Sequence, residues 1–142
     1  MKVIIGSDHA GFSVKERLKC FLAENNIETE DVGPYSEDSV DYPDYAKKVA
    51  KKVADNKELK GILICGSGTG MAMAANKIKG IRAAVGYDTY IAEMSRLHND
   101  ANVLCLRERE FPYEKTKEIV DVWLKTPFSN DERHKRRIEK IE

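Results

Sequence analysis

The sequence has few cysteines and lacks any long apolar run. Its three cysteines stand at positions 20, 65 and 105, an odd number without the close pairing of a structural zinc site. No apolar stretch approaches the roughly 18 residues of a membrane-spanning helix. The opening apolar stretch is too short for the core of a signal peptide, and no small-residue cleavage pattern follows it. We therefore expect free thiols, no metal, no membrane partner and a cytoplasmic protein.

An excess of charge of either sign is also absent. Lys plus Arg and Asp plus Glu number 24 each, so no net field attracts nucleic acid or anionic lipid. Internal repeats, linkers and low-complexity segments are missing as well. A chain of 142 residues is long enough for one core. We expect a single domain over residues 1–142 and no nucleic-acid partner.

Apolar residues recur in patterns that alternate between strand and helix. Strands are expected at residues 3–5, 28–32, 61–65, 81–85 and 103–106, and helices at residues 14–22, 42–53, 71–78, 89–97, 111–124 and from 130 onward. The run from Gly61 to Cys65 is typical of a parallel strand buried on both faces. The alternation predicts an α/β fold, a Rossmann-like three-layer αβα sandwich with a five-stranded parallel sheet. Ligands of such sheets bind at the carboxyl ends of the strands.

A glycine-rich loop follows the most apolar strand. The segment from Cys65 to Gly70 reads Cys-Gly-Ser-Gly-Thr-Gly and leads into a predicted helix. Glycines at alternate positions let the backbone approach a ligand and direct successive N–H groups at an anion. The plainer interpretation is a tight turn that uses glycine for its geometry alone. We favour an anion-binding loop.

Three familiar loop types fit this segment poorly. A dinucleotide fingerprint needs a glycine where Met71 stands, although Asp88 lies at the spacing of a ribose-binding acid. A P-loop needs a lysine directly after its last glycine, and the first lysine here is Lys77. A cysteine phosphatase needs a nearby arginine, and Arg82 is too distant. What remains is a cysteine beside an anion-binding loop.

Cys65 is a candidate base because of this position. A thiolate is stabilised by backbone N–H groups and by a helix N-terminus, which suits a thiol that takes up and releases a proton. The alternative is a small buried hydrophobic residue, the interpretation that we prefer for Cys20 and Cys105.

Two further polar clusters follow predicted elements. Asp8 and His9 end the first strand, a plausible neighbour of the strand that ends at Cys65. His98 and Asn99 lie between the fourth helix and the fifth strand, which ordinarily places them at the opposite edge of the sheet. A capping or surface role for His9, and a structural role for His98, remain as alternatives.

Arg133 and Arg137 stand four residues apart on the last predicted helix. Two guanidinium groups at this spacing share one helix face and can hold a phosphate together. The plainer interpretation, a solvated charged helix, is favoured by the residues alone.

Taken together, these segments resemble the ribose-5-phosphate isomerase B family, which groups with galactose- and allose-phosphate isomerases. The resemblance runs nearly end to end and rests on residues 6–12 (GSDHAGF), 41–43 (DYP), 65–70 (CGSGTG), 74–77 (AANK), 96–102 (RLHNDAN) and 133–137 (RHKRR). Better-known members have threonine where this chain has Ser67. That departure keeps the hydroxyl group and bears on how the sugar fits.

The resemblance implies an aldose–ketose isomerase that interconverts ribose 5-phosphate and ribulose 5-phosphate through an enediolate, without a cofactor. Cys65 would move the proton and His98 would assist ring opening with Asp8 close by, while Ser67 and the loop N–H groups would hold the enediolate oxygens. The implied substrate-binding residues are Asp8, His9, Tyr42, Gly66, Ser67, Gly68, Thr69, Gly70, Asn99, Arg109, Arg133 and Arg137. Within that set His9, Arg109, Arg133 and Arg137 would bind the phosphate, and Arg109 is the least secure match of the four.

The resemblance also implies a homodimer whose site is completed by a second subunit. The helix at residues 130–142 would pack on the partner, and the sequence leaves open whether dimers pair into tetramers. Two other functions remain in view: the same reaction on a six-carbon sugar phosphate such as allose 6-phosphate or galactose 6-phosphate, and a non-catalytic sugar-phosphate sensor.

Overall fold

The computed structural model describes residues 1–142 as five strands alternating with helices, followed by one terminal helix. The strands are β1 (Lys2–Ser7), β2 (Glu28–Asp31), β3 (Leu59–Cys65), β4 (Ala83–Val85) and β5 (Val103–Arg107). The helices are α1 (Phe12–Glu24), α2 (Tyr42–Asp55), α3 (Thr69–Ala75), α4 (Thr89–Leu97), α5 (Tyr113–Lys125) and α6 (Glu132–Ile141). Every predicted element is present, and the largest shift in a boundary is at α3, which ends three residues before the predicted Ile78.

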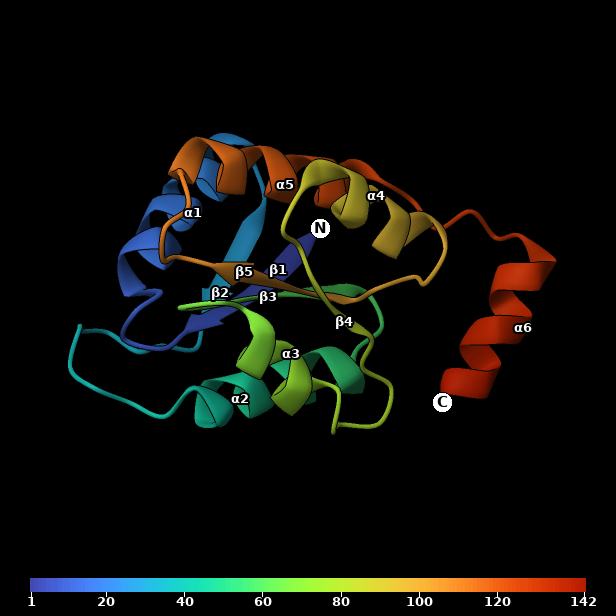
Figure 1. The fold of residues 1–142 in the computed structure, drawn as a ribbon, viewed down its shortest axis with the longest axis horizontal. Helices are drawn as coiled ribbons and strands as arrows, with labels where there is room; N and C mark the ends of the chain where they lie inside the picture. The colour runs from blue at the N-terminus through green and yellow to red at the C-terminus, as the bar shows by residue number, and fades with distance from the viewer.

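The strands form one parallel sheet in the order β2-β1-β3-β5-β4. Figure 1 shows α1, α4 and α5 covering one face and α2 and α3 covering the other. The predicted three-layer α/β sandwich is therefore confirmed. Because β1 lies directly beside β3, the ends of these two strands meet, as expected for Asp8 and Cys65.

The core consists of two apolar layers separated by the sheet. Ile62 and Ile64 of β3 pack with α1 and α5, whereas Leu63 and Cys65 pack with α2 and α3. Successive side chains of a strand point to opposite faces, so a strand covered on both faces is apolar throughout. This burial explains why β3 was the clearest strand in the sequence.

A buried lysine joins α1 to the end of β2. The side chain of Lys15 is fully buried, and its Nζ donates hydrogen bonds to both carboxylate oxygens of Asp31 at 2.8 Å and to the carbonyl oxygen of Pro34 at 2.6 Å. A buried ammonium group requires such partners. The sequence pattern gave no sign of this contact, since lysine normally marks an exposed helix face.

Helix α6 stands apart from the rest of the molecule at one end of the sheet (Figure 1). His134 is the only one of its ten residues that is buried. A helix that buries so little of its surface gains little stability from its own chain. None of the helices combines the length and the apolarity of a membrane span.

Candidate active site

A cavity of about 990 Å³ opens at the carboxyl ends of β1, β3 and β5. Its lining includes Asp8, Tyr42, Cys65, Gly66, Ser67, Thr69, Gly70, Arg107 and Arg109. These residues come from four separate segments of the chain, which the parallel sheet brings to one edge. The structure thus gathers most of the predicted site residues in one place.

The glycine-rich loop bends back so that its backbone faces the thiol of Cys65. Gly68 adopts the left-handed conformation with φ 80°, and its N–H donates to Cys65 Sγ across 3.1 Å. Cys65 is 5% exposed, and its thiol lies at the cavity rather than deep in the core. The sulfur of Cys65 therefore has both a backbone donor and access to the cavity.

Two glycines of the loop make room for the side chains that form the cavity walls. A Cβ atom on Gly70 would lie 2.6 Å from the ring of Tyr42, so only glycine allows this tyrosine to cover the loop. A Cβ atom on Gly66 would lie 3.3 Å from Arg109 Cδ. The side chain of Arg109 therefore contacts the loop. The backbone of Arg109 is held by Arg107, whose Nη2 donates a hydrogen bond to the Arg109 carbonyl oxygen at 2.9 Å. Arg109 therefore lies beside the glycine-rich loop.

Asp8 and His9 are fixed at the end of β1. The N–H of Asp8 donates to the carbonyl of Ile64 at 3.1 Å, and Asp8 Oδ1 accepts from Gly11 N at 3.0 Å. His9 Nδ1 lies 3.2 Å from Val40 N and 3.3 Å from Val40 O. The loop before α2 therefore holds the imidazole ring of His9. His9 directly follows Asp8, which lines the cavity.

His98 and Asn99 lie at the opposite edge of the sheet. They follow α4 and precede β5, whose first residue Val103 pairs with Gly61, whereas Cys65 pairs with Arg107. Four residues of β3 separate Gly61 from Cys65, which corresponds to roughly 13 Å along the strand. Both side chains are exposed, and neither lines the cavity. Within one chain this is the position that the order of the elements predicts.

His98 stacks against a histidine that the sequence reasoning did not single out. The ring centroids of His98 and His134 are 4.4 Å apart, and His134 Nδ1 lies 2.9 Å from Ser129 Oγ. Desolvation, followed by the nearby His98 and Arg133, lowers the pKa of His134. A histidine inside a run of charged residues on a helix was the one available signal for this contact.

Arg133 and Arg137 lie on exposed turns of α6, on the same side of the molecule as His98. Arg133 Nε makes a local ion pair with Asp131 Oδ2 at 3.4 Å. Neither arginine lines the cavity that holds Cys65. The predicted site residues thus fall into two groups, one around the cavity and one around His98 and α6.

Other polar features of the chain have local roles. Asp88, which lies at the spacing of a ribose-binding acid, caps α4 by accepting from Ile91 N at 2.7 Å. Histidine, cysteine and carboxylate side chains form no group of three or more that could hold a metal ion.

Comparisons with known proteins all match one family. A family model described as Ribose/Galactose Isomerase matches residues 3–141. Ribose-5-phosphate isomerase B of Escherichia coli is 44% identical over 140 residues, which cover 99% of this chain and 93% of that protein. The match thus extends over both groups of site residues.

Solved structures agree with this result. A ribose 5-phosphate isomerase of Thermotoga maritima superposes with a TM-score of 0.95 at 51% identity and covers 99% of this chain and 96% of its own. Ribose-5-phosphate isomerase B of Mycoplasma genitalium, crystallised with bound ribulose-5-phosphate, superposes with a TM-score of 0.94 at 43% identity. The alignment covers 99% of this chain and 93% of that protein.

Proposed function

This chain belongs to the Ribose/Galactose Isomerase family, and on that premise we propose that it interconverts ribose 5-phosphate and ribulose 5-phosphate through an enediolate. The observation that carries the proposal is the thiol of Cys65 at a cavity, facing a loop whose Gly68 N–H donates to its sulfur. An aldose–ketose isomerase needs a base next to the first two sugar carbons, and this thiol is suitably placed.

Proton transfer is assigned to Cys65. The thiolate removes a proton from C2 of the open-chain aldose and returns it to C1, while the proton of the C2 hydroxyl passes to the C1 oxygen; the reverse transfers regenerate the aldose. The negative charge that develops on the sugar oxygens is stabilised by donors that are already in place. Backbone N–H groups of the cavity-lining loop residues Gly66 to Gly70, apart from that of Gly68, and the exposed hydroxyl of Ser67 would supply such donors.

Ring opening and phosphate binding are assigned to the residues at the other end of the molecule. His98 is a suitable acid and base for the furanose ring, because an imidazole side chain can both donate and accept a proton. Arg133 and Arg137 suit phosphate, which guanidinium groups bind in a bidentate manner. Arg109 and His9 would hold the phosphate from the cavity side.

The separation of the two groups supports a homodimer. Within one chain, His98 and α6 lie at the edge of the sheet opposite to Cys65, so one chain does not assemble the whole site. A second copy can supply His98, Asn99, Arg133 and Arg137 to the cavity of the first. A two-fold axis then completes both sites at once. The same contact would cover α6, which its own chain leaves exposed.

The direct test is an assay of ribose 5-phosphate isomerisation in the presence of a chelator. We expect turnover that the chelator leaves unchanged, because no residue of the proposed mechanism acts through a metal. Tight binding of the sugar phosphate without any exchange of its C2 proton into solvent would instead identify a sensor and refute the isomerase.

A six-carbon sugar phosphate is the second candidate substrate, because the matching family includes galactose isomerases. Ser67 stands at the sugar-binding loop, and the cavity of about 990 Å³ has space for an additional carbon. Comparing kcat/KM for ribose 5-phosphate, allose 6-phosphate and galactose 6-phosphate decides between the two. A clear preference for either hexose phosphate would overturn the pentose assignment.

A further inference from the structure

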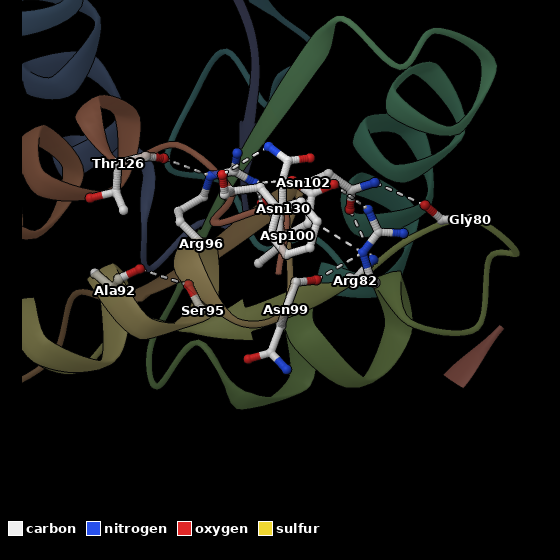
Figure 2. Close-up of polar contacts among 12 residues, drawn as sticks. Gly80, Arg82, Ala92, Ser95, Arg96, Asn99, Asp100, Asn102, Thr126 and Asn130 are labelled. Carbon is white, nitrogen blue, oxygen red and sulfur yellow. Dashed lines mark hydrogen bonds and ion pairs between the residues drawn. The ribbon is translucent and has the colours of Figure 1, made fainter. Parts of the chain in front are cut away.

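The turn that carries His98 and Asn99 ends in an unusual residue. Asp100 has φ 45°, a left-handed conformation that aspartate tolerates better than most residues but that remains uncommon. Its carboxylate lies between two arginines. Arg96 Nη1 donates to Oδ1 at 2.8 Å, and Arg82 Nη2 donates to Oδ2 at 3.2 Å. Figure 2 shows the two guanidinium groups approaching Asp100 from opposite sides.

The same two arginines also hold the backbone of the turn. Arg82 Nε donates to the carbonyl oxygens of Asn99 at 3.0 Å and of Asp100 at 3.1 Å. Arg96 Nη1 donates to the carbonyl of Ala101 at 2.6 Å. Three consecutive carbonyl groups therefore bind guanidinium donors, and Asp100 orients both donors (Figure 2). A turn held in this way has little freedom to rotate His98 or Asn99.

Asp100 is also central to the local charge. Arg96 is 6% exposed, Arg82 is partly buried, and the half-buried Lys60 lies nearby. Burial and the neighbouring Arg96 lower the pKa of Lys60, whereas Asp100 opposes them. Buried like charges repel strongly unless an anion lies between them. Without the charge of Asp100, the arginines would move apart and release the turn.

Helix α6 is attached to the same cluster at both of its ends. Near its start, His134 stacks on His98. At its end, Glu142 Oε1 accepts from Arg82 Nη1 at 2.7 Å. The arginine that holds the His98 turn therefore also holds the helix that carries Arg133 and Arg137.

We propose that Asp100 is a positioning residue: held between Arg82 and Arg96, its carboxylate fixes His98 in the orientation that ring opening requires. This inference rests on the proposed role of His98. Asp100 does not line the cavity of Cys65, so it acts on the ring-opening step and leaves the proton transfer at Cys65 unaffected.

The two steps can be measured separately because the two substrates differ in ring chemistry. Ribose 5-phosphate closes a five-membered ring between C1 and the C4 oxygen, so it must be opened. In ribulose 5-phosphate the C5 oxygen carries the phosphate, so no such ring forms on C2. Exchange of the C1 proton of ribulose 5-phosphate with solvent thus reports binding and proton transfer without ring opening.

The experiment compares the full-length Asp100→Asn variant with wild type in both assays. Asparagine keeps the size of the side chain and tolerates the left-handed conformation, but it removes the charge. We expect isomerisation of ribose 5-phosphate to fall about 10- to 100-fold, the scale of a small misplacement of a catalytic group. Proton exchange into ribulose 5-phosphate should stay within about twofold, because the Cys65 step is intact.

Asp121→Asn is the matched control. This change also removes one carboxylate from an ion pair with a residue four positions away, here Lys125 on the outer face of α5. Both of its rates should equal those of wild type. If Asp100→Asn does not fold, Arg82→Lys replaces it, since lysine keeps the charge but loses the forked contact with the turn. The same divergence of the two rates is expected.

Equal losses in both assays would show that Asp100 only supports the structure, and unchanged rates would show that it does nothing for the turn. Either result overturns the proposal. Failure of the wild-type protein to isomerise ribose 5-phosphate would instead overturn the proposed function, and the positioning role with it.

Discussion

At the scale of single residues, two buried cysteines of the same apolar layer differ in their surroundings. Cys105 is fully buried, and desolvation strongly raises the pKa of its thiol. Cys65, two residues further along the sheet, receives the N–H of Gly68 and opens onto the cavity. Burial alone therefore does not separate Cys105 from the proposed base Cys65, whereas the neighbouring donor and the cavity do.

Replacement of Cys65 tests the assignment of the base. Cys65→Ala should lower isomerisation and C2 proton exchange about 100-fold or more, the usual scale for a lost general base. Substrate binding, measured by calorimetry, should persist because Arg109 and the loop N–H groups remain. The exposed Cys20 provides the control, and Cys20→Ala should leave turnover unchanged. Near-normal proton exchange in a folded Cys65→Ala protein would make Cys65 a packing residue.

At the scale of elements, the junction of α1 with β2 depends on a buried charge. Lys15 is fully buried against Asp31, whereas Lys19 binds the same carboxylate at 2.8 Å and is one third exposed. Burial by itself would raise the pKa of Asp31, but hydrogen bonds from Lys15 and Lys19 lower it below its usual value. The exposure of each lysine determines how much its contact with Asp31 contributes to the free energy of unfolding.

Lys15→Met should therefore lower the free energy of unfolding by about 3 kcal/mol, near the low end for breaking a buried pair, since Lys19 still binds Asp31. Lys19→Met is the matched change at the exposed partner and should cost no more than about 1 kcal/mol. Urea denaturation measures both. A smaller loss for Lys15→Met than for Lys19→Met would contradict the role of burial.

The same pair predicts a dependence on pH. A carboxylate whose pKa is lowered in the folded state contributes its full stability above the unfolded value of about 4 and loses it as the pH falls through the folded value. The stability difference between wild type and Lys15→Met should thus be constant above about pH 5 and should shrink below pH 4. A difference that grew on acidification would refute the depressed pKa of Asp31.

Helix α6 offers a second test at this scale. Arg137→Ala should raise KM for ribose 5-phosphate about tenfold or more with a smaller change in kcat, because phosphate binding is separate from proton transfer. Arg136→Ala removes the same charge from the neighbouring position, which lies on another face of the helix, and should leave KM nearly unchanged. An unchanged KM with a collapsed kcat for Arg137→Ala would contradict phosphate binding.

At the scale of the whole molecule, the proposed site residues form two groups that lie apart within one chain. Cys65 and the cavity lie at the carboxyl ends of the strands, whereas His98 and α6 lie at the other edge. Both groups lie within the region that matches the family. The geometry is understandable if each chain contributes one half of two symmetric sites.

Mixing two impaired variants, assayed at ribose 5-phosphate concentrations well below KM, tests this arrangement. After subunit exchange between Cys65→Ala and Arg137→Ala proteins, each mixed dimer should contain one site with both residues intact. Random exchange of equal amounts should restore about a quarter of the wild-type sites, since half of the dimers are mixed and each has one working site. Activity is measured before and after exchange, with mass-labelled chains to verify mixing. If activity did not recover after verified exchange, Cys65 and Arg137 would not serve one site from two different chains.

The sequence by itself determined the order of the elements and the parallel sheet. Apolar runs such as the one that ends at Cys65 are local consequences of burial on both faces, and helices such as α2 show one apolar stripe. The glycines around Ser67 likewise indicated a loop that approaches a ligand. Such signals lie within a few neighbouring residues, so they can be recognised from the sequence alone.

Only the tertiary structure decided which side chains lie together across the chain. Asp100 lies between Arg82 and Arg96 without any sign in the sequence. His134 contacts His98, and its place in a charged helical run was the one sign of that contact. Lys15 looked like an exposed helix residue and proved to be buried. Contacts of this kind depend on sheet order and register, which relate distant segments and are not encoded in local periodicity. They fix how the site is held, whereas the local motifs fix what chemistry it contains.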